Sequence, residues 1–182
     1  MSTKPCVGRD ELATLVEQAK DGKEAATEEL IRRYQERIAG FVFSLIGRDD
    51  VIEDLCHEAF IKMIVGLPRL KDGGAFEPWL FQIARNVCFD HLRRLRFRRL
   101  FIPFEPEHEN VMIASAPEAS MDNFGKILTE LPARQRELIL LVAESEFSYE
   151  ELAKITGSTV SAVKSRLFRA REHLKRRLDD ES

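Results

Sequence analysis

The sequence predicts an all-α protein of two small helical domains joined by a flexible linker, the second domain containing a helix-turn-helix. Three observations lead to this fold class. Apolar residues recur every three or four positions along most of the 182-residue chain, without the alternation of period two that strands show. Between about residues 100 and 122 the chain turns proline-rich and acidic and loses its helical period. After this stretch, a capping box and a glycine are spaced as in a helix-turn-helix.

Four helices are expected in the first domain, residues 1–99. Their approximate ranges are 10–20, 23–46, 50–65 and 77–94. Glycines follow the first three helices at positions 22, 47 and 66, where a residue free to adopt positive φ stops a helix. Asp49 or Asp50 is expected to cap the third helix, and Pro78 stands in the first turn of the fourth, where proline is tolerated.

The second domain, residues 123–182, is short enough that only a small helical bundle is expected. One helix follows Leu131 and Pro132, and Ser148 with Glu151 forms a capping box for the next. Counted from Tyr149 as position one, four positions hold the residue types that a helix-turn-helix needs. These are the aliphatic Leu152 at position four, the small Ala153 at five, Gly157 in the turn at nine and the aliphatic Val163 at fifteen. The last helix is expected over about 160–178 and can enter a major groove with its N-terminal half.

Composition narrows the possible functions. With 44% hydrophobic and 32% charged residues the chain is typical of a soluble globular protein. Its longest apolar run, 41–46, is interrupted by Ser44 and is far too short for a membrane helix, so membrane insertion is not expected. The first ten residues lack the apolar core of a secretory signal, which favours the cytoplasm. The chain has three cysteines, which are odd in number and widely spaced: Cys6, Cys56 and Cys88. Their spacing predicts neither a disulfide framework nor a metal site. No cofactor is predicted.

The charges are unevenly distributed along the chain. The whole chain carries a net charge of −3, yet residues 85–99 carry +5 and residues 154–178 carry +7, which leaves −15 on the rest. Two compact basic stretches on an acidic chain indicate two separate contacts with a polyanion, together with acidic surface for another partner. Within the second stretch, Lys164, Ser165 and Arg169 share one side of the predicted helix. Solvated basic helix faces are the alternative interpretation of either stretch.

Four blocks of sequence, at 25–34, 52–60, 79–86 and 163–171, resemble those of extracytoplasmic-function sigma factors, two-domain members of the bacterial sigma-70 family. The resemblance covers the chain from about Asp10 to Leu178. It implies a transcription initiation factor and not an enzyme. The first domain would grip core RNA polymerase and open the −10 promoter element, and the second would read the −35 element. The resemblance also implies a role in stress response and control by an anti-sigma factor.

The resemblance assigns polymerase binding to one segment of the third predicted helix, with the residues Asp54, Leu55, Glu58 and Phe60. An acidic and apolar helix suits a basic helical partner. Two interpretations of the apolar pair, Leu55 and Phe60, stay open, because core packing explains them as well as docking does.

The fourth predicted helix corresponds to the −10 reader, with Trp79, Asn86, Asp90, Arg93 and Arg94 as its candidate residues. An unstacked base needs hydrogen-bonding groups and stacking surface, and the amide of Asn86 offers both a donor and an acceptor. Asp90 departs from the amide that some relatives carry. Arg93 and Arg94 fit phosphate contacts, while Trp79 fits either strand separation or core packing.

In the second domain the resemblance assigns −35 contacts to six residues. Lys164, Ser165, Phe168 and Arg169 would reach the bases, and Arg166 and Arg171 would touch phosphates, which position a protein without specifying sequence. A helix-turn-helix regulator that acts without core polymerase is the alternative function. A recombinase or nuclease would need a nucleophile or a carboxylate cluster, and the sequence shows neither pattern.

Overall fold

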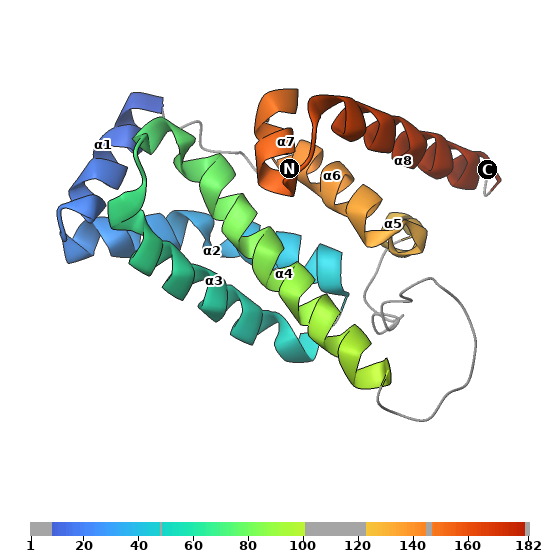
Figure 1. Ribbon diagram of the computed structural model, residues 1–182, viewed down its shortest axis with the longest axis horizontal. Coiled ribbons are helices and arrows are strands. Elements are labelled where there is room, and N and C mark those ends of the chain that lie inside the picture. The colour runs from blue at the N-terminus through green and yellow to red at the C-terminus, as the bar shows by residue number, and fades with distance from the viewer. Residues whose placement is uncertain (1–8, 48, 101–122, 145–146, 181–182) are drawn as a thin grey trace.

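The computed structural model describes residues 9–47, 49–100, 123–144 and 147–180, and it confirms the all-α fold class (Figure 1). Within these ranges there is no strand. The α-helices are α1 (Arg9–Lys20), α2 (Glu24–Ile46), α3 (Ile52–Gly66), α4 (Phe76–Leu100), α5 (Asn123–Glu130), α6 (Ala133–Glu144), α7 (Tyr149–Thr156) and α8 (Val160–Asp180). Short 3-10 turns lie at Asp49–Val51, Leu67–Arg69 and Gly73–Ala75. Residues 101–122, most of the predicted linker, lie outside the described residues.

Most predicted helix ends agree with the structure to within about two residues. The fourth helix was predicted to end near residue 94, but α4 continues to Leu100. Gly66 was predicted to stop the third helix and is instead the last residue of α3, with a φ of −85°. Gly47 adopts a φ of 71° and donates its N–H to the carbonyl of Phe43, which closes α2 in the left-handed conformation that glycine allows. The aspartate cap predicted for the third helix is wrong. A 3-10 turn occupies positions 49 and 50, and Val51 stands at the N-cap of α3 without a side-chain cap bond.

Helices α1 to α4 form the first group and pack around the apolar stripe of α2. Leu30, Ile38 and Phe41 on this stripe are fully buried, and the ring centroid of Phe41 lies 5.5 Å from that of Phe81 on α4. The two rings meet edge to face, the arrangement that aromatic quadrupoles favour. This packing fixes α4 along α2 and α3 and sets which side of α4 faces outward.

Helices α5 to α8 form the second group, and α5 was not predicted. Ile127 and Leu128 on α5 are buried, but a helix of eight residues is too short to be stable or recognisable without its partners. Arg136 of α6 is buried and donates to the carbonyls of Leu128, Thr129 and Leu131, which lie at the end of α5 and just after it. Burial lowers the pKa of Arg136 to about 10.

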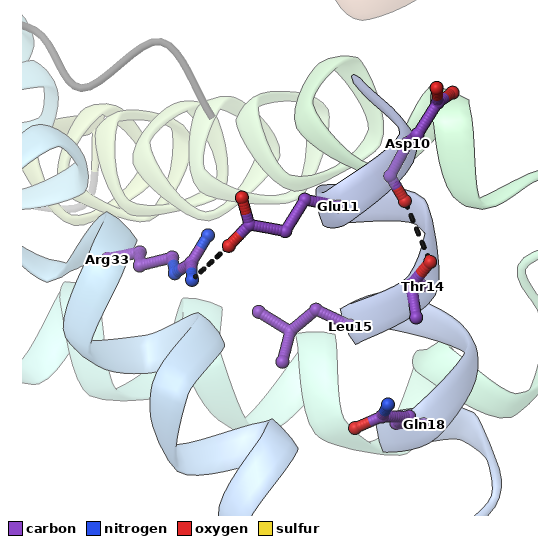
Figure 2. Close-up of a pocket in the computed structure, with 6 residues that line it drawn as sticks. All are labelled: Asp10, Glu11, Thr14, Leu15, Gln18 and Arg33. Atoms are coloured by element: carbon purple, nitrogen blue, oxygen red, sulfur yellow. Dashed lines mark hydrogen bonds and ion pairs between the residues drawn. The ribbon is translucent and has the colours of Figure 1, made fainter. Parts of the chain in front are cut away.

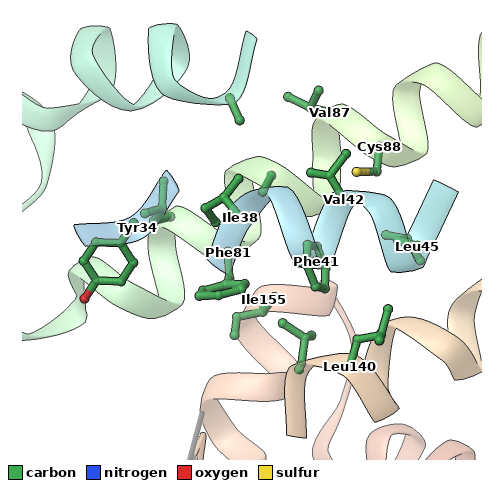
Figure 3. Packing of buried hydrophobic residues seen from close by; sticks show 14 of the residues in the cluster. Tyr34, Ile38, Phe41, Val42, Leu45, Phe81, Val87, Cys88, Leu140 and Ile155 are labelled. Atoms are coloured by element: carbon green, nitrogen blue, oxygen red, sulfur yellow. The ribbon is translucent and has the colours of Figure 1, made fainter. Parts of the chain in front are cut away.

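The two groups pack against each other, α6 on α2 and α7 on α4 (Figure 1). Figure 3 shows Phe41 and Phe81 of the first group beside Leu140 and Ile155 of the second. The buried apolar residues of both groups form one continuous cluster. The chain therefore adopts a closed arrangement, in which both groups share a core.

Candidate nucleic-acid interface

The helix-turn-helix is built locally by α7, a glycine turn and α8. Ser148 accepts the backbone N–H of Glu151, whose carboxylate accepts the N–H of Ser148, so the predicted capping box is present. Gly157 has a φ of 59°, and the next residue donates its N–H to the carbonyl of Ala153. The buried stripe of α8, which begins at Val163, faces the rest of the second group. The opposite side of α8 is left open to solvent.

Five of the six candidate −35 residues are exposed on α8, namely Lys164, Ser165, Phe168, Arg169 and Arg171. Phe168 is 66% exposed, a large apolar side chain that contributes nothing to the core of this chain. The guanidinium of Arg169 lies over its own helix, 3.3 Å from the carbonyl oxygen of Ser165. The ammonium of Lys164 lies 5.1 Å from the ring centroid of Tyr149, within cation–π range. These contacts hold two basic side chains on one face at the start of α8.

Arg166 differs from the other five candidates. It is partly buried, and its Nη1 donates to the hydroxyl of Ser158 in the turn at 3.1 Å. Arg166 therefore braces the turn against α8, and a phosphate contact through it has to share the guanidinium with Ser158.

The candidate −10 residues lie along α4 in different environments. Asn86, Arg93 and Arg94 are exposed, while Asp90 is partly exposed and pairs with Arg93 at 3.3 Å. The Asp90 carboxylate is therefore already paired with a cation from its own helix.

Trp79 is partly buried beside the core at the start of α4. Its ring centroid lies 6.0 Å from that of Phe76, and a Cβ built on Gly66 would stand 2.8 Å from the Trp79 ring. The indole thus packs over Gly66 at the end of α3, and this position gives Trp79 a structural role at the junction of α3 and α4.

The fold brings together Arg85 and Glu137, two residues without a predicted role, between the two groups. Arg85 Nε donates to Glu137 at 2.8 Å, and its Nη1 donates to the side-chain oxygen of Asn86 at 3.0 Å. The Glu137 side chain is fully buried, and burial raises the pKa of its carboxyl despite the nearby Arg85, Arg134 and Arg166. No sequence pattern identifies this pair, because its members lie 52 positions apart.

The four candidate polymerase-binding residues divide between surface and core. Asp54 is exposed on α3, and Glu58 is partly exposed and pairs with Lys62 at 2.7 Å. Leu55 is 4% exposed and belongs to the core, and Phe60 packs partly buried against it.

Three other apolar residues of α3 face solvent and were missed. Ile61, Ile64 and Val65 are 51%, 46% and 67% exposed, at the three- and four-residue spacing of one helix face. Their signal in the sequence is that α3 is apolar on more sides than the buried stripe of Leu55 and Met63 needs. These three residues together are called the α3 apolar face below.

Two clefts lie on the first group. One, of about 280 Å³ between α3 and α4, is lined by Val51, Asp54, Leu55, Glu58, His91, Arg94 and Leu95. It brings the acids Asp54 and Glu58 close to Arg94, so candidate polymerase-binding and −10 residues meet at one place. The other, of about 340 Å³ between α1 and α2, contains no candidate residue, and Figure 2 shows Arg33 bound to Glu11 there.

The described residues contain no group of three or more side chains suited to hold a metal ion, and none of their helices could cross a membrane. Cys88 is buried, which raises the pKa of its thiol to about 12, and Cys56 is partly buried with a raised pKa as well. Both thiols are therefore poor nucleophiles at neutral pH.

Comparison with known proteins gives the same two regions. The family model for Sigma-70 region 2 matches residues 30–98, and that for Sigma-70, region 4, matches residues 121–174. The chain is 32% identical to the ECF RNA polymerase sigma factor EcfG of Rhodopseudomonas palustris, over 75% of this chain and 76% of that one.

Two solved structures are similar over most of the chain. One is CnrH in complex with the cytosolic domain of CnrY, with a TM-score of 0.69 and 25% identity over 94% of this chain and 99% of that one. The other is the sigma factor RpoE in complex with the anti-sigma factor NepR from Bartonella quintana, with a TM-score of 0.67 and 30% identity over 84% and 96%.

Proposed function

This chain belongs to the extracytoplasmic-function sigma factors of the sigma-70 family, and from that premise we propose how its residues divide the work of promoter recognition. As a sigma factor it directs core RNA polymerase to specific promoters and initiates transcription. It acts by binding, in the cytoplasm, and supplies no catalytic group. A helix-turn-helix regulator independent of polymerase is not favoured, because it leaves the region 2 match unexplained.

The exposed face of α8 reads the −35 element. The observation that carries this proposal is the set of five exposed candidate side chains opposite a buried apolar stripe. Lys164 and Arg169 provide donors for the acceptors of guanine, and Phe168 provides apolar contact for a thymine methyl. Arg166 and Arg171 contact phosphates. Ser165 lies between Lys164 and Arg169 on the exposed face, and its carbonyl oxygen accepts from Arg169.

Residues 1–99 hold the polymerase and act on the −10 element. Asn86 contacts an unstacked base, and Arg93 and Arg94 contact the phosphates of the single strand. The partly buried position of Trp79 supports packing more than strand separation. Asp90 contacts DNA only if its ion pair with Arg93 breaks and its carboxylate binds a base instead.

The outer side of α3 docks on core polymerase. Its acids, Asp54 and Glu58, favour a basic partner, and the α3 apolar face supplies an exposed surface that a partner can bury. Leu55 and Phe60 support this surface from the core. An anti-sigma factor is a further proposed partner, supported by the likeness to a sigma factor solved with one.

In vitro transcription with core polymerase on a genomic fragment library, with start sites mapped, tests the function. On a promoter so found, Asn86→Ala should impair strand opening and leave the closed complex largely intact, because its base partner appears only in melted DNA. Permanganate footprinting measures the opening. Normal opening with lost closed-complex affinity would place Asn86 on duplex DNA instead.

The docking surface needs its own variant. Val65→Asp adds a charge to the α3 apolar face without touching the core, and it should reduce co-purification with core polymerase. Leu178→Asp is a matched control, since Leu178 is 43% exposed at the far end of α8. Equal polymerase binding by both variants would remove the α3 apolar face from the interface.

A further inference from the structure

The second helical group contacts one strip of α4 through four pairs of residues. The contacts run along the helix in this order: the Phe81 ring with Phe147, the Gln82 amide with the carbonyl of Lys154, Arg85 with Glu137, and the Phe89 ring with the guanidinium of Arg134. Residues 82, 85 and 89 recur at spacings of three and four, so they lie on one side of α4. Asn86 is exposed directly beside this side. The second group therefore covers the part of α4 that borders the proposed −10 contacts.

Arg85 is placed in this strip as an anion-binding residue. Its guanidinium lies 4.4 Å from the ring centroid of Phe89, donates to Glu137 at 2.8 Å and donates to Asn86 at 3.0 Å. The fork of a guanidinium fits a phosphate as well as a carboxylate. An anion that replaced Glu137 here would sit next to the side chain proposed to bind an unstacked base.

The closed arrangement is too small to reach both promoter elements. A compact chain of this length has a radius of gyration of about 16 Å, or a diameter of about 40 Å. The names of the −10 and −35 elements give their positions, which differ by about 25 base pairs. At about 3.4 Å per base pair this separation is about 85 Å. The two groups must separate before α4 and α8 can both contact promoter DNA.

We propose that in the free chain the second helical group masks a DNA-contacting strip of α4. In this state the Glu137 carboxylate binds Arg85 where a phosphate of the DNA backbone would otherwise bind. Arg85 is then a further −10 contact that becomes available only when the groups separate. Two contacts on α2 assist closure: Arg37 with Glu144, and Arg136 with the carbonyl of Leu45 at 3.3 Å. The inference rests on the proposed reading of the −10 element by α4.

Charge reversal at the pair tests the mask in the full-length chain. Glu137→Arg places two cations together and should open the chain, and Arg85→Glu should open it from the other side. The exchanged pair, Arg85→Glu with Glu137→Arg, should close it again. Glu130→Arg is the matched control, because it makes the same charge change in the second group while its partners, Arg177 and His173, both belong to α8.

Two measurements separate the expected results. Small-angle scattering should show a larger radius of gyration for both single variants, and the wild-type radius for the exchanged pair and for Glu130→Arg. Fluorescence anisotropy with a single-stranded oligonucleotide of about 12 nucleotides should show Glu137→Arg binding about fivefold tighter than Glu130→Arg. Arg85→Glu should open without any gain in affinity, because it lacks the contact.

Either of two results overturns the proposal. One is a wild-type radius for a folded Glu137→Arg chain, and the other is an opened Glu137→Arg chain that binds DNA no tighter than Glu130→Arg. Circular dichroism checks folding. If Glu137→Arg does not fold, an unchanged radius for Arg85→Glu, whose site is 12% exposed, overturns the mask. Failure of the wild-type chain to start transcription with core polymerase would instead contradict the proposed function.

Discussion

Individual side chains of α8 carry the same charge but are held by different neighbours. Lys164 lies over the ring of Tyr149 and Arg169 lies along its own helix backbone, so both heads stay on the open face. Arg171 is exposed further along the helix. A base reader and a phosphate contact should therefore respond differently to truncation.

Lys164→Ala or Arg169→Ala should reduce the discrimination between a matched and a mismatched −35 element. A bidentate base contact contributes about 1–3 kcal/mol of discrimination, which sets the size of the loss. Electrophoretic mobility shifts of the polymerase holoenzyme on matched and mismatched promoters measure it. Arg171→Ala is the control, because a lost phosphate contact should weaken binding to both promoters alike. A uniform loss in Lys164→Ala would make Lys164 a phosphate contact.

Glu130 connects stability to pH. Hydrogen bonds from Arg177 lower the pKa of the Glu130 carboxyl below its usual 4.5. Because the folded pKa is depressed, this pair stabilises the fold above pH 4.5, and its contribution is lost as the pH falls further. The carboxyl is 38% exposed, so the contribution should not exceed about 1 kcal/mol.

Urea unfolding of Glu130→Gln between pH 3 and pH 7 checks this linkage. The expected difference in unfolding free energy from the wild type is on the order of tenths of a kcal/mol. The variant should lose less stability on acidification than the wild type. Arg177→Ala should flatten the acid limb in the same way, since it removes the same pair. An acid limb as steep as that of the wild type in both variants would contradict the assignment.

Among the elements, the contact between α3 and α4 depends on a glycine. A Cβ on Gly66 would stand 2.8 Å from Cζ2 of Trp79, closer than real side-chain atoms approach. The φ of Gly66 is −85°, so its backbone does not require glycine. The Trp79 ring alone is what excludes a side chain here.

Gly66→Ala should therefore destabilise the chain by about 1–3 kcal/mol through overpacking, as measured by urea unfolding. Gly40→Ala, in the interior of α2 where nothing lies within 4 Å of the added Cβ, should stabilise it by about 0.5–1 kcal/mol. If both variants gained stability equally, the Trp79 ring would be free to move away from α3.

Taken as one body, the closed chain presents only two small basic areas to DNA, on α4 and on α8. The first basic stretch is partly covered by the second group at Arg85, and the rest of the chain outside the two stretches carries −15. Phosphate contacts are few and are opposed by this acidic surface.

The free chain should accordingly bind promoter duplex weakly at physiological salt, and core polymerase should be needed for tight and specific binding. Fluorescence anisotropy of labelled promoter DNA, with and without polymerase, measures the difference. Nanomolar binding by the free chain would contradict a sigma factor mechanism and favour a regulator that acts alone.

Local signals in the sequence determined most helix boundaries and the helix-turn-helix. Gly47, Gly157 and the Ser148 capping box act within one turn of chain, so their effect does not depend on distant residues. The exposed readers of α8 were predictable for a similar reason, since helical period separates Lys164 from the buried Val163.

The tertiary structure alone decided what covers each helix face. Periodicity groups residues on a face but does not say which element packs there, and α3 shows the consequence: Leu55 is buried while Ile61 and Val65 are open. The helix α5 and the buried Arg136 likewise depend on partners across the bundle. Arg85 and Glu137 meet only because α6 packs on α2 and α7 packs on α4, and contacts between segments so far apart are set by packing and burial.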